Sequence, residues 1–123
     1  MAQYVDGFVL PIQKKKVAAY RRIAKQASRV WRDHGALDYR ECIGEQLECG
    51  FGVPFTQLAK ARRGETVVFA WIVYKSRAHR DRVTAAVMSD PRMALICNPL
   101  KVPFDLTRMA CGGFAVLVDG RKR

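Results

Sequence analysis

Two side chains capable of acid–base chemistry stand two positions apart in a segment with strand character. Tyr39 and Glu41 lie within the predicted strand Leu37–Ile43. Side chains two positions apart on a strand share one face, so Arg40 points to the other face. A carboxylate beside a phenol is suited to general acid–base chemistry. Polar pairs of this kind are also common on sheet surfaces, and that is the alternative interpretation.

A second carboxylate interrupts the apolar strand predicted over Tyr4–Ile12. Asp6 would share a face with the apolar side chains at alternate positions of this strand. A buried carboxylate must be paired or have a raised pKa, and perturbed pKa values gather at functional sites. The alternative is a structural ion pair with Arg40 or Arg108, or a place at the end of the strand.

The other candidates are histidine, tryptophan and arginine side chains. His34 closes the apolar stripe of the first predicted helix, where a histidine interacts favourably with the helix dipole and the end carbonyls. His79 falls in the first turn of the next helix beside basic residues, which favour its neutral form, and it faces either a pocket or solvent. Trp31 and Trp71 are expected in the core, with stacking on an aromatic ligand as the alternative. The ligand-binding candidates are Asp6, His34, Tyr39, Glu41, Trp71, His79 and Arg108.

Established catalytic and cofactor motifs are missing from the sequence. It contains no GxGxxG or GxxxxGK[ST] loop, no HExxH and no GxSxG, so a nucleotide-phosphate loop, a zincin and an α/β-hydrolase have no support. The four cysteines form no CxxC pair, and free thiols are the expected state, with two disulfides as the alternative. No ligand spacing supports a zinc site. We therefore expect neither a metal nor a cofactor.

The net charge of +11, from 22 Lys and Arg against 11 Asp and Glu, is the anomaly of the composition. Such a charge favours contact with nucleic acid or acidic membrane surfaces. On the first predicted helix, however, Arg22, Lys25, Arg29 and Arg32 recur opposite the apolar stripe, as on an ordinary solvated helix face. No nucleic-acid motif accompanies them. Non-specific nucleic-acid binding is therefore an alternative function, and a basic surface without a partner is the simpler interpretation.

The hydrophobic pattern predicts the elements that position these side chains. Strands are predicted at Tyr4–Ile12, Leu37–Ile43, Val67–Val73 and Met109–Val118, and helices at Lys14–His34, from a Ser76 cap to Ser89, and at Arg92–Cys97. A long connection, Gly44–Gly64, has one helical turn near Thr56–Lys60, and Gly112 and Gly113 suggest a bulge or a close backbone approach in the last strand. This order predicts an α+β, ferredoxin-like βαββαβ topology, with a four-stranded antiparallel sheet and helices on one face.

The segment Glu65–Val87 indicates that the chain associates with a second copy of itself. Its strand, Val67–Val73, is apolar at every position, so both faces of the sheet must be covered. The helices cover one face, and an open apolar patch of this size usually marks an interface. We therefore expect a homodimer in which two sheets pack face to face around a barrel-like interior, burying about 800 Å² or more per subunit.

The length of 123 residues fits a single domain over residues 1–123, with a frayed basic tail at 119–123. No apolar run approaches the roughly 20 residues that a membrane span needs. Met1–Ile12 has no basic n-region ahead of its short apolar stretch, which argues against a secretory signal. The expected location is the cytoplasm, without membrane contact.

Five blocks of the sequence resemble the YbaA-like family of uncharacterised bacterial proteins, which belongs to the dimeric α+β barrel group. The blocks are YVDGFVLP (Tyr4–Pro11), WRDHGALDYREC (Trp31–Cys42), ETVVFAWIVYKSRAHRD (Glu65–Asp81), VMSDPRM (Val87–Met93) and PFDLTRMACGGF (Pro103–Phe114). The resemblance implies a ferredoxin-like topology and a homodimer, and it supplies no activity. This chain departs from the family pattern in its higher basic charge, in a less acidic connection after Ile43 and in Cys111, where a larger residue is common.

Related barrels of the same broad group include cofactor-free oxygenases and haem-degrading enzymes, which use a pocket between the sheet and its helices. The leading prediction is therefore a homodimeric barrel that binds an unknown small molecule in such a pocket. The first alternative is a cofactor-independent oxygenase acting on a small aromatic or quinol substrate, with His34, Tyr39 and Trp71 as its candidate residues. The second alternative is the non-specific binding of nucleic acid.

Overall fold

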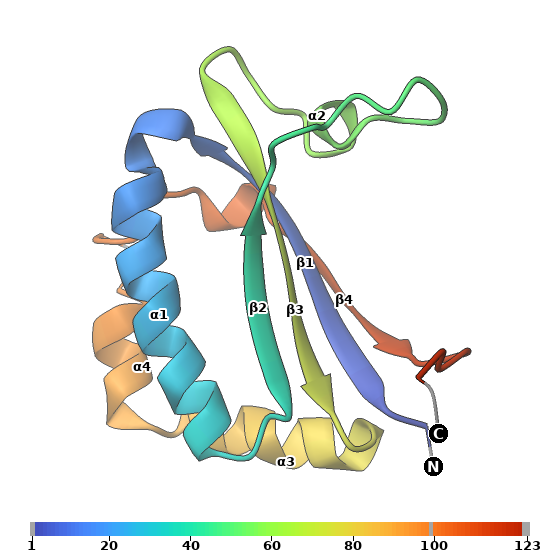
Figure 1. Cartoon of the computed structure of the whole chain (residues 1–123). Coiled ribbons are helices and arrows are strands. Elements are labelled where there is room, and N and C mark those ends of the chain that lie inside the picture. The colour runs from blue at the N-terminus through green and yellow to red at the C-terminus, as the bar shows by residue number, and fades with distance from the viewer. Residues whose placement is uncertain (1, 99, 122–123) are drawn as a thin grey trace.

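The computed structural model, which describes residues 2–98 and 100–121, has the predicted α+β, ferredoxin-like topology (Figure 1). The antiparallel sheet has the strand order β2-β3-β1-β4. Its strands are β1 (Tyr4–Gln13), β2 (Asp38–Ile43), β3 (Glu65–Tyr74) and β4 (Ala110–Ala115). The helices are α1 (Val17–Asp33), α2 (Phe55–Leu58), α3 (Arg77–Met88) and α4 (Pro91–Ile96), with 3-10 turns η1 (Lys14–Lys16) and η2 (Leu106–Arg108).

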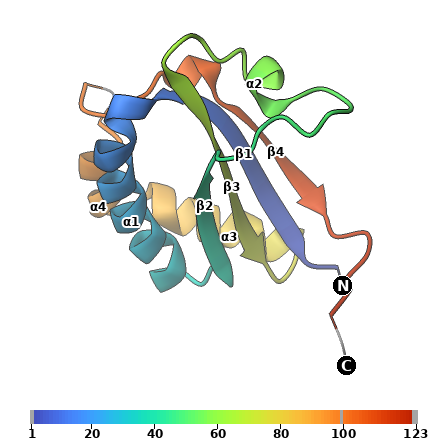
Figure 2. The ribbon, with the colours of Figure 1, turned by 45° about the horizontal axis from the view of Figure 1, so that its top comes forward.

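The helices α1, α3 and α4 lie against one face of the sheet (Figures 1 and 2). The register places Leu10 opposite Val68 and Asp6 opposite Ile72, so these side chains share the helix-covered face. The buried core on this face combines strand residues (Leu10, Ile12, Val68, Ile72 and Tyr74) with helix residues (Val30, Val83 and Val87). Burial of each large side chain contributes about 1.5–3 kcal/mol, and this packing fixes the helices on the sheet.

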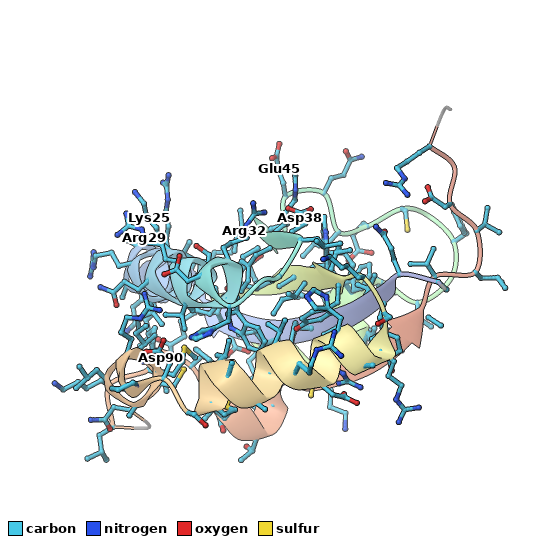
Figure 3. All side chains as sticks on the ribbon, turned by 90° about the horizontal axis from the view of Figure 1, so that it is seen from below. Lys25, Arg29, Arg32, Asp38, Glu45 and Asp90 are labelled. Carbon is cyan, nitrogen blue, oxygen red and sulfur yellow. The ribbon has the colours of Figure 1, made fainter. Side chains whose placement is uncertain are left out.

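Helix α1 is amphipathic, as predicted. It buries Tyr20, Val30 and Trp31 against the sheet, while Lys25 and Arg29 project outward from the helix (Figure 3). The basic face of this helix is therefore solvated. The helix ends before Gly35, whose φ of 108° is readily adopted by glycine and rarely by other residues.

The predicted caps of α3 and α4 are present. The Ser76 hydroxyl accepts a hydrogen bond from the His79 N–H over 3.1 Å at the start of α3. At the start of α4, Asp90 accepts from the Arg92 N–H over 2.9 Å, and Pro91 occupies the first helical position. The turn between the two helices lies beside the end of α1, where Asp90 contacts His34 and Arg92 donates to Asp33.

The other face of the sheet, which we call the open face, is largely apolar, with the ion pair of Asp38 and Arg40 on the edge strand β2. It carries Val5 and Val9 of β1, Phe69, Trp71 and Val73 of β3, and Phe114 of β4. Phe69 is 43% exposed and Phe114 is 61% exposed. Helix α2 reaches one end of this face, where the ring of Phe55 lies 5.8 Å from that of Phe69. Much of the apolar surface of this face is therefore exposed to solvent in a single chain.

The last strand is shorter than predicted. It ends at Ala115, opposite Tyr4, because β1 offers no further partner beyond the bond from the Val116 N–H to the Gln3 carbonyl. The pairing through Gly112 and Gly113 is continuous, so the predicted bulge is wrong. What lies close to Gly113 is the side chain of Tyr4 and not another backbone segment. The end of the predicted basic tail, at 122–123, lies outside the described residues.

Helix α1 begins at Val17, three residues after the predicted start at Lys14, because Lys14–Lys16 form the 3-10 turn η1. The remaining boundaries differ by one or two residues. The helical turn in the long connection begins at Phe55 instead of Thr56, and α4 begins at Pro91. Within the described ranges, no helix is long and apolar enough to cross a membrane.

Candidate functional site

A cavity of about 230 Å³ lies between the sheet and the helices and is partly open to solvent. Strands β1, β2 and β3 form its floor, α1 and the α3–α4 region form its walls, and the segment before β4 closes one side. The lining side chains include Phe8, Ala24, Trp31, Met93, Phe104 and Met109. The walls are therefore mostly apolar and rich in aromatic rings.

Glu41 supplies a carboxylate to this cavity, and two tyrosines hold it. The Tyr39 hydroxyl donates to Glu41 Oε2 over 2.7 Å, and the Tyr20 hydroxyl donates to Glu41 Oε1. Tyr39 and Glu41 come from the same face of β2, as predicted, and Tyr20 comes from the buried stripe of α1. We call these three residues the Glu41 cluster.

Burial, and after it the charge of Glu41, keeps both phenols protonated by raising their pKa values. Burial raises the pKa of Tyr20, and the charge and hydrogen bond of Glu41 raise it further. The pKa of Tyr39 is raised by the same causes in the same order. No Lys, Arg or His among residues 2–98 and 100–121 forms an ion pair with Glu41. The carboxylate is therefore stabilised by neutral donors and not by a cation.

Asp6 lies elsewhere and has a different partner from those predicted. It is buried, and Arg80 of α3 donates to its Oδ1 over 3.2 Å while stacking 4.8 Å from the Tyr4 ring centroid. The prediction of Arg40 or Arg108 as its partner is wrong. Arg40 lies on the open face because strand side chains alternate, and Arg108 is bound to another carboxylate.

His34 and His79 have structural contacts outside the cavity. His34 Nε2 lies 2.8 Å from Asp90 Oδ2, and its backbone N–H donates to the Val30 carbonyl at the end of α1. His79 Nδ1 accepts from the Lys75 N–H over 2.9 Å. The pKa of His79 is lowered, first by burial and then by nearby cations, in agreement with the predicted neutral form.

Arg108 and Trp71 also lie outside the Glu41 cluster. Arg108 donates two hydrogen bonds to Glu65, over 2.6 and 2.8 Å, and one to the Lys60 carbonyl. The hydrogen bond from Arg108 lowers the pKa of Glu65 to about 2. Trp71 belongs to the cavity lining, but strand alternation turns its side chain to the open face, 5.5 Å from the Phe69 ring. The prediction that it lies in the core is therefore wrong.

The structure therefore brings together two of the seven candidates, Tyr39 and Glu41. Trp31, predicted as core, is buried and also lines the cavity. Tyr20 was missed, because a tyrosine on the apolar stripe of a helix is usually ordinary core. The feature that could have identified Tyr20 is its hydroxyl, because a buried hydroxyl needs a hydrogen-bond partner and the topology places α1 over the polar side chains of β2.

Metal-ligating side chains do not cluster. In the described part of the chain, no three His, Cys, Asp or Glu residues are placed to hold a metal ion. The cysteines Cys42, Cys49, Cys97 and Cys111 are free thiols, which is the predicted state.

The sequence matches the family described as "Protein of unknown function (DUF1428)" over residues 3–106. It is 39% identical over 117 residues to "Uncharacterized protein YbaA" of Escherichia coli K12, which covers 95% of this chain and 98% of that protein. The YbaA protein of Shigella flexneri matches to the same extent. These relatives agree with the family resemblance found in the sequence blocks.

Solved structures share the fold. An uncharacterised NIPSNAP domain protein from Burkholderia xenovorans has a TM-score of 0.61 at 17% identity, covering 98% of this chain and 99% of its own. A dimeric ferredoxin-like protein from an uncultured marine organism has a TM-score of 0.56 at 9% identity, covering 97% and 99%. At these identities the similarity concerns the fold alone.

Proposed function

We propose that this chain, which belongs to the DUF1428 family of proteins of unknown function, binds a small and largely apolar molecule in the cavity between its sheet and helices. The observation that carries this proposal is the Glu41 cluster at the wall of an otherwise apolar cavity of about 230 Å³. Ligand sites typically combine apolar walls with a few placed polar groups. A cavity of about 150 Å³ holds benzene, so this one has room for a ring with a short substituent.

The oxygenase alternative has less support. Of its three candidate residues, Tyr39 and Trp71 line the cavity and His34 does not, and strand alternation turns the Trp71 side chain away from the helix-covered face. His34 is bound to Asp90 at the end of α1, and the Trp71 side chain lies on the open face. An oxygenase site formed by these residues would need all three side chains to reach the same bound substrate.

The proposal includes a homodimer formed through the open face. Its support is the exposure of Phe69 and Phe114 in an apolar sheet surface, together with the marine neighbour, which is described as dimeric. A second copy placed sheet to sheet would remove both rings from water. About 800 Å² per subunit is the usual area for a stable pair.

Non-specific nucleic-acid binding is a second candidate, favoured by the outer face of α1. Lys25 and Arg29 point outward there (Figure 3), and neither forms an ion pair with another described residue. Retention on double-stranded DNA should then fall steeply with salt. An absence of retention at low salt would remove this candidate.

The binding proposal is tested by calorimetric titration of the purified protein with 2-phenylethylamine and 2-phenylethanol. Ala24 lines the cavity, so the variant Ala24→Leu fills part of it and should abolish binding. Ala18 is exposed on the same helix, so Ala18→Leu is the matched control and should leave binding unchanged. Equal binding by the two variants, or no heat from either compound with the unmodified protein, would contradict the proposal.

A further inference from the structure

We infer that the cavity selects a protonated amine over an alcohol or a carboxylic acid of the same shape. This inference deepens the proposed function and rests on it. The structural basis is a carboxylate, Glu41, that faces an apolar cavity with two phenol donors and no cation as partners.

The hydrogen-bond capacity of the Glu41 cluster defines what it offers to a ligand. An ionised carboxylate accepts and does not donate, and a tyrosine has a single O–H proton. Tyr20 and Tyr39 both give that proton to Glu41, one to each carboxylate oxygen. The remaining capacity of all three side chains is therefore for accepting hydrogen bonds. A ligand group that meets them must donate.

The charge at this point of the cavity favours a cation. Each Glu41 oxygen has a neutral donor, and no cationic side chain of the described residues forms an ion pair with it. Arg21 lines a neighbouring pocket that Glu41 also lines, but it does not line the cavity. Among the other lining side chains, Trp31 and Cys97 carry N–H and S–H groups without charge. Attraction between opposite charges strengthens in an apolar site, and a charge-assisted hydrogen bond is about twice as strong as a neutral one.

The walls fit the rest of such a molecule. Rings of Phe8, Tyr20, Trp31 and Phe104 line the cavity, and the Tyr20 and Phe104 rings meet edge to face at 5.4 Å. Aromatic faces attract cations as well as burying apolar groups. The site therefore suits a primary ammonium joined by a short chain to one ring or a small alkyl group.

The overall charge of +11 opposes a preference for amines, so such a preference could not come from the charge of the protein as a whole. At long range the basic surface attracts acids and repels amines. That field is screened over about 8 Å at physiological salt, whereas a contact inside the cavity is screened much less. Selection of an amine would therefore report the Glu41 cluster and not the surface.

The test compares 2-phenylethylamine, 2-phenylethanol and phenylacetate by calorimetry at neutral pH. We expect the amine to bind at least tenfold more tightly than the alcohol, and the acid to bind most weakly. Glu41→Gln should weaken amine binding about tenfold to one-hundredfold, as for the loss of a hydrogen bond between charged groups, and should change alcohol binding much less. Glu45→Gln, at an exposed carboxylate just beyond β2, is the matched control and should change neither.

Alcohol binding as tight as amine binding would overturn the inference, as would an unchanged amine affinity in Glu41→Gln. If the alcohol binds and Ala24→Leu abolishes it, the cavity function stands and only the amine preference fails. If none of the three compounds binds, both proposals fail. The ranking of the three compounds on the unmodified protein decides the question even if Glu41→Gln does not fold.

Discussion

The hydroxyl of Tyr39 donates to Glu41 over 2.7 Å although the two residues belong to the same strand and lie only two positions apart. Tyr20, from the facing helix, donates to the other carboxylate oxygen. The Tyr20 bond joins α1 to β2 at the edge of the cavity. Together, the two bonds also explain how an apolar wall accommodates a carboxylate, because neither oxygen is left without a donor.

This relationship predicts the effect of Tyr39→Phe. The variant removes one donor and leaves a carboxylate oxygen unsatisfied, so the free energy of unfolding should fall by about 1–3 kcal/mol. In a Glu41→Leu background the same substitution should cost less, since no carboxylate remains to be satisfied. Urea denaturation of the four proteins in this double-mutant cycle measures the coupling. An equal cost in both backgrounds would mean that the bond does not stabilise the fold.

Two neighbouring glycines of β4 should respond differently to alanine. A Cβ at Gly113 would lie 2.7 Å from Tyr4 Cε2, on the helix-covered face, and would displace the ring that stacks with Arg80. A Cβ at Gly112 would lie 3.7 Å from the Phe114 ring, which is ordinary contact. Gly113→Ala should therefore lower the free energy of unfolding by about 1–3 kcal/mol, as overpacking does.

The matched variant Gly112→Ala should change stability by about 0.5 kcal/mol or less. Thermal or urea unfolding at a fixed protein concentration compares the two variants. Equal losses would indicate a general intolerance of side chains in β4 and not a specific contact with Tyr4.

The Glu65–Arg108 pair predicts a loss of stability in acid. The pKa of Glu65 is about 2 in the folded protein, below its ordinary value of 4.5, because Arg108 stabilises the charged form. The folded state then binds this proton less readily than the unfolded state. The contribution to stability is therefore fully present above pH 4.5 and is lost as the pH falls toward 2.

Glu65→Gln should flatten this part of the stability profile, whereas Glu48→Gln, at an exposed carboxylate, should not. Urea midpoints between about pH 5 and about pH 2 provide the measurement. A profile for Glu65→Gln as steep as that of the unmodified protein would contradict the assignment.

The proposed dimer predicts a monomer when the open face is charged. Phe69→Glu places a carboxylate in the centre of the apolar surface, and sedimentation at micromolar concentration should record the loss of dimer. Leu95→Glu is the control, because Leu95 is 80% exposed on α4, on the opposite side of the sheet, and the variant should remain dimeric. A stable, folded single subunit of the unmodified protein at the same concentration would contradict the dimer.

The topology and the Tyr39–Glu41 pair were predictable because both follow from periodicity along the chain. Alternation on a strand places residues two apart on one face, whatever the strand packs against. The wholly apolar β3, by contrast, does not reveal which of its faces meets the helices. For this reason Trp71 was expected in the core, whereas its side chain lies on the open face.

Contacts between distant segments were beyond the sequence patterns. Arg80 reaches Asp6 across 74 positions only because α3 packs over β1 and β3. Tyr20 meets Glu41 only because α1 crosses β2. The length of β4 was overestimated because its apolar composition continues to Val118, whereas its hydrogen-bonding partner, β1, begins at Tyr4. Each error concerns a property of the packed fold and not of the local sequence.

Methyl NMR of the protein labelled with ¹³C at its methionine methyl groups tests the central claim most directly. Met93 and Met109 both line the cavity, one from α4 and one from the segment before β4. Titration with 2-phenylethylamine should move both methyl signals over the concentrations at which calorimetry records binding, and Ala24→Leu should abolish the movement. Binding heat without any movement of these two signals would place the ligand elsewhere and contradict the account.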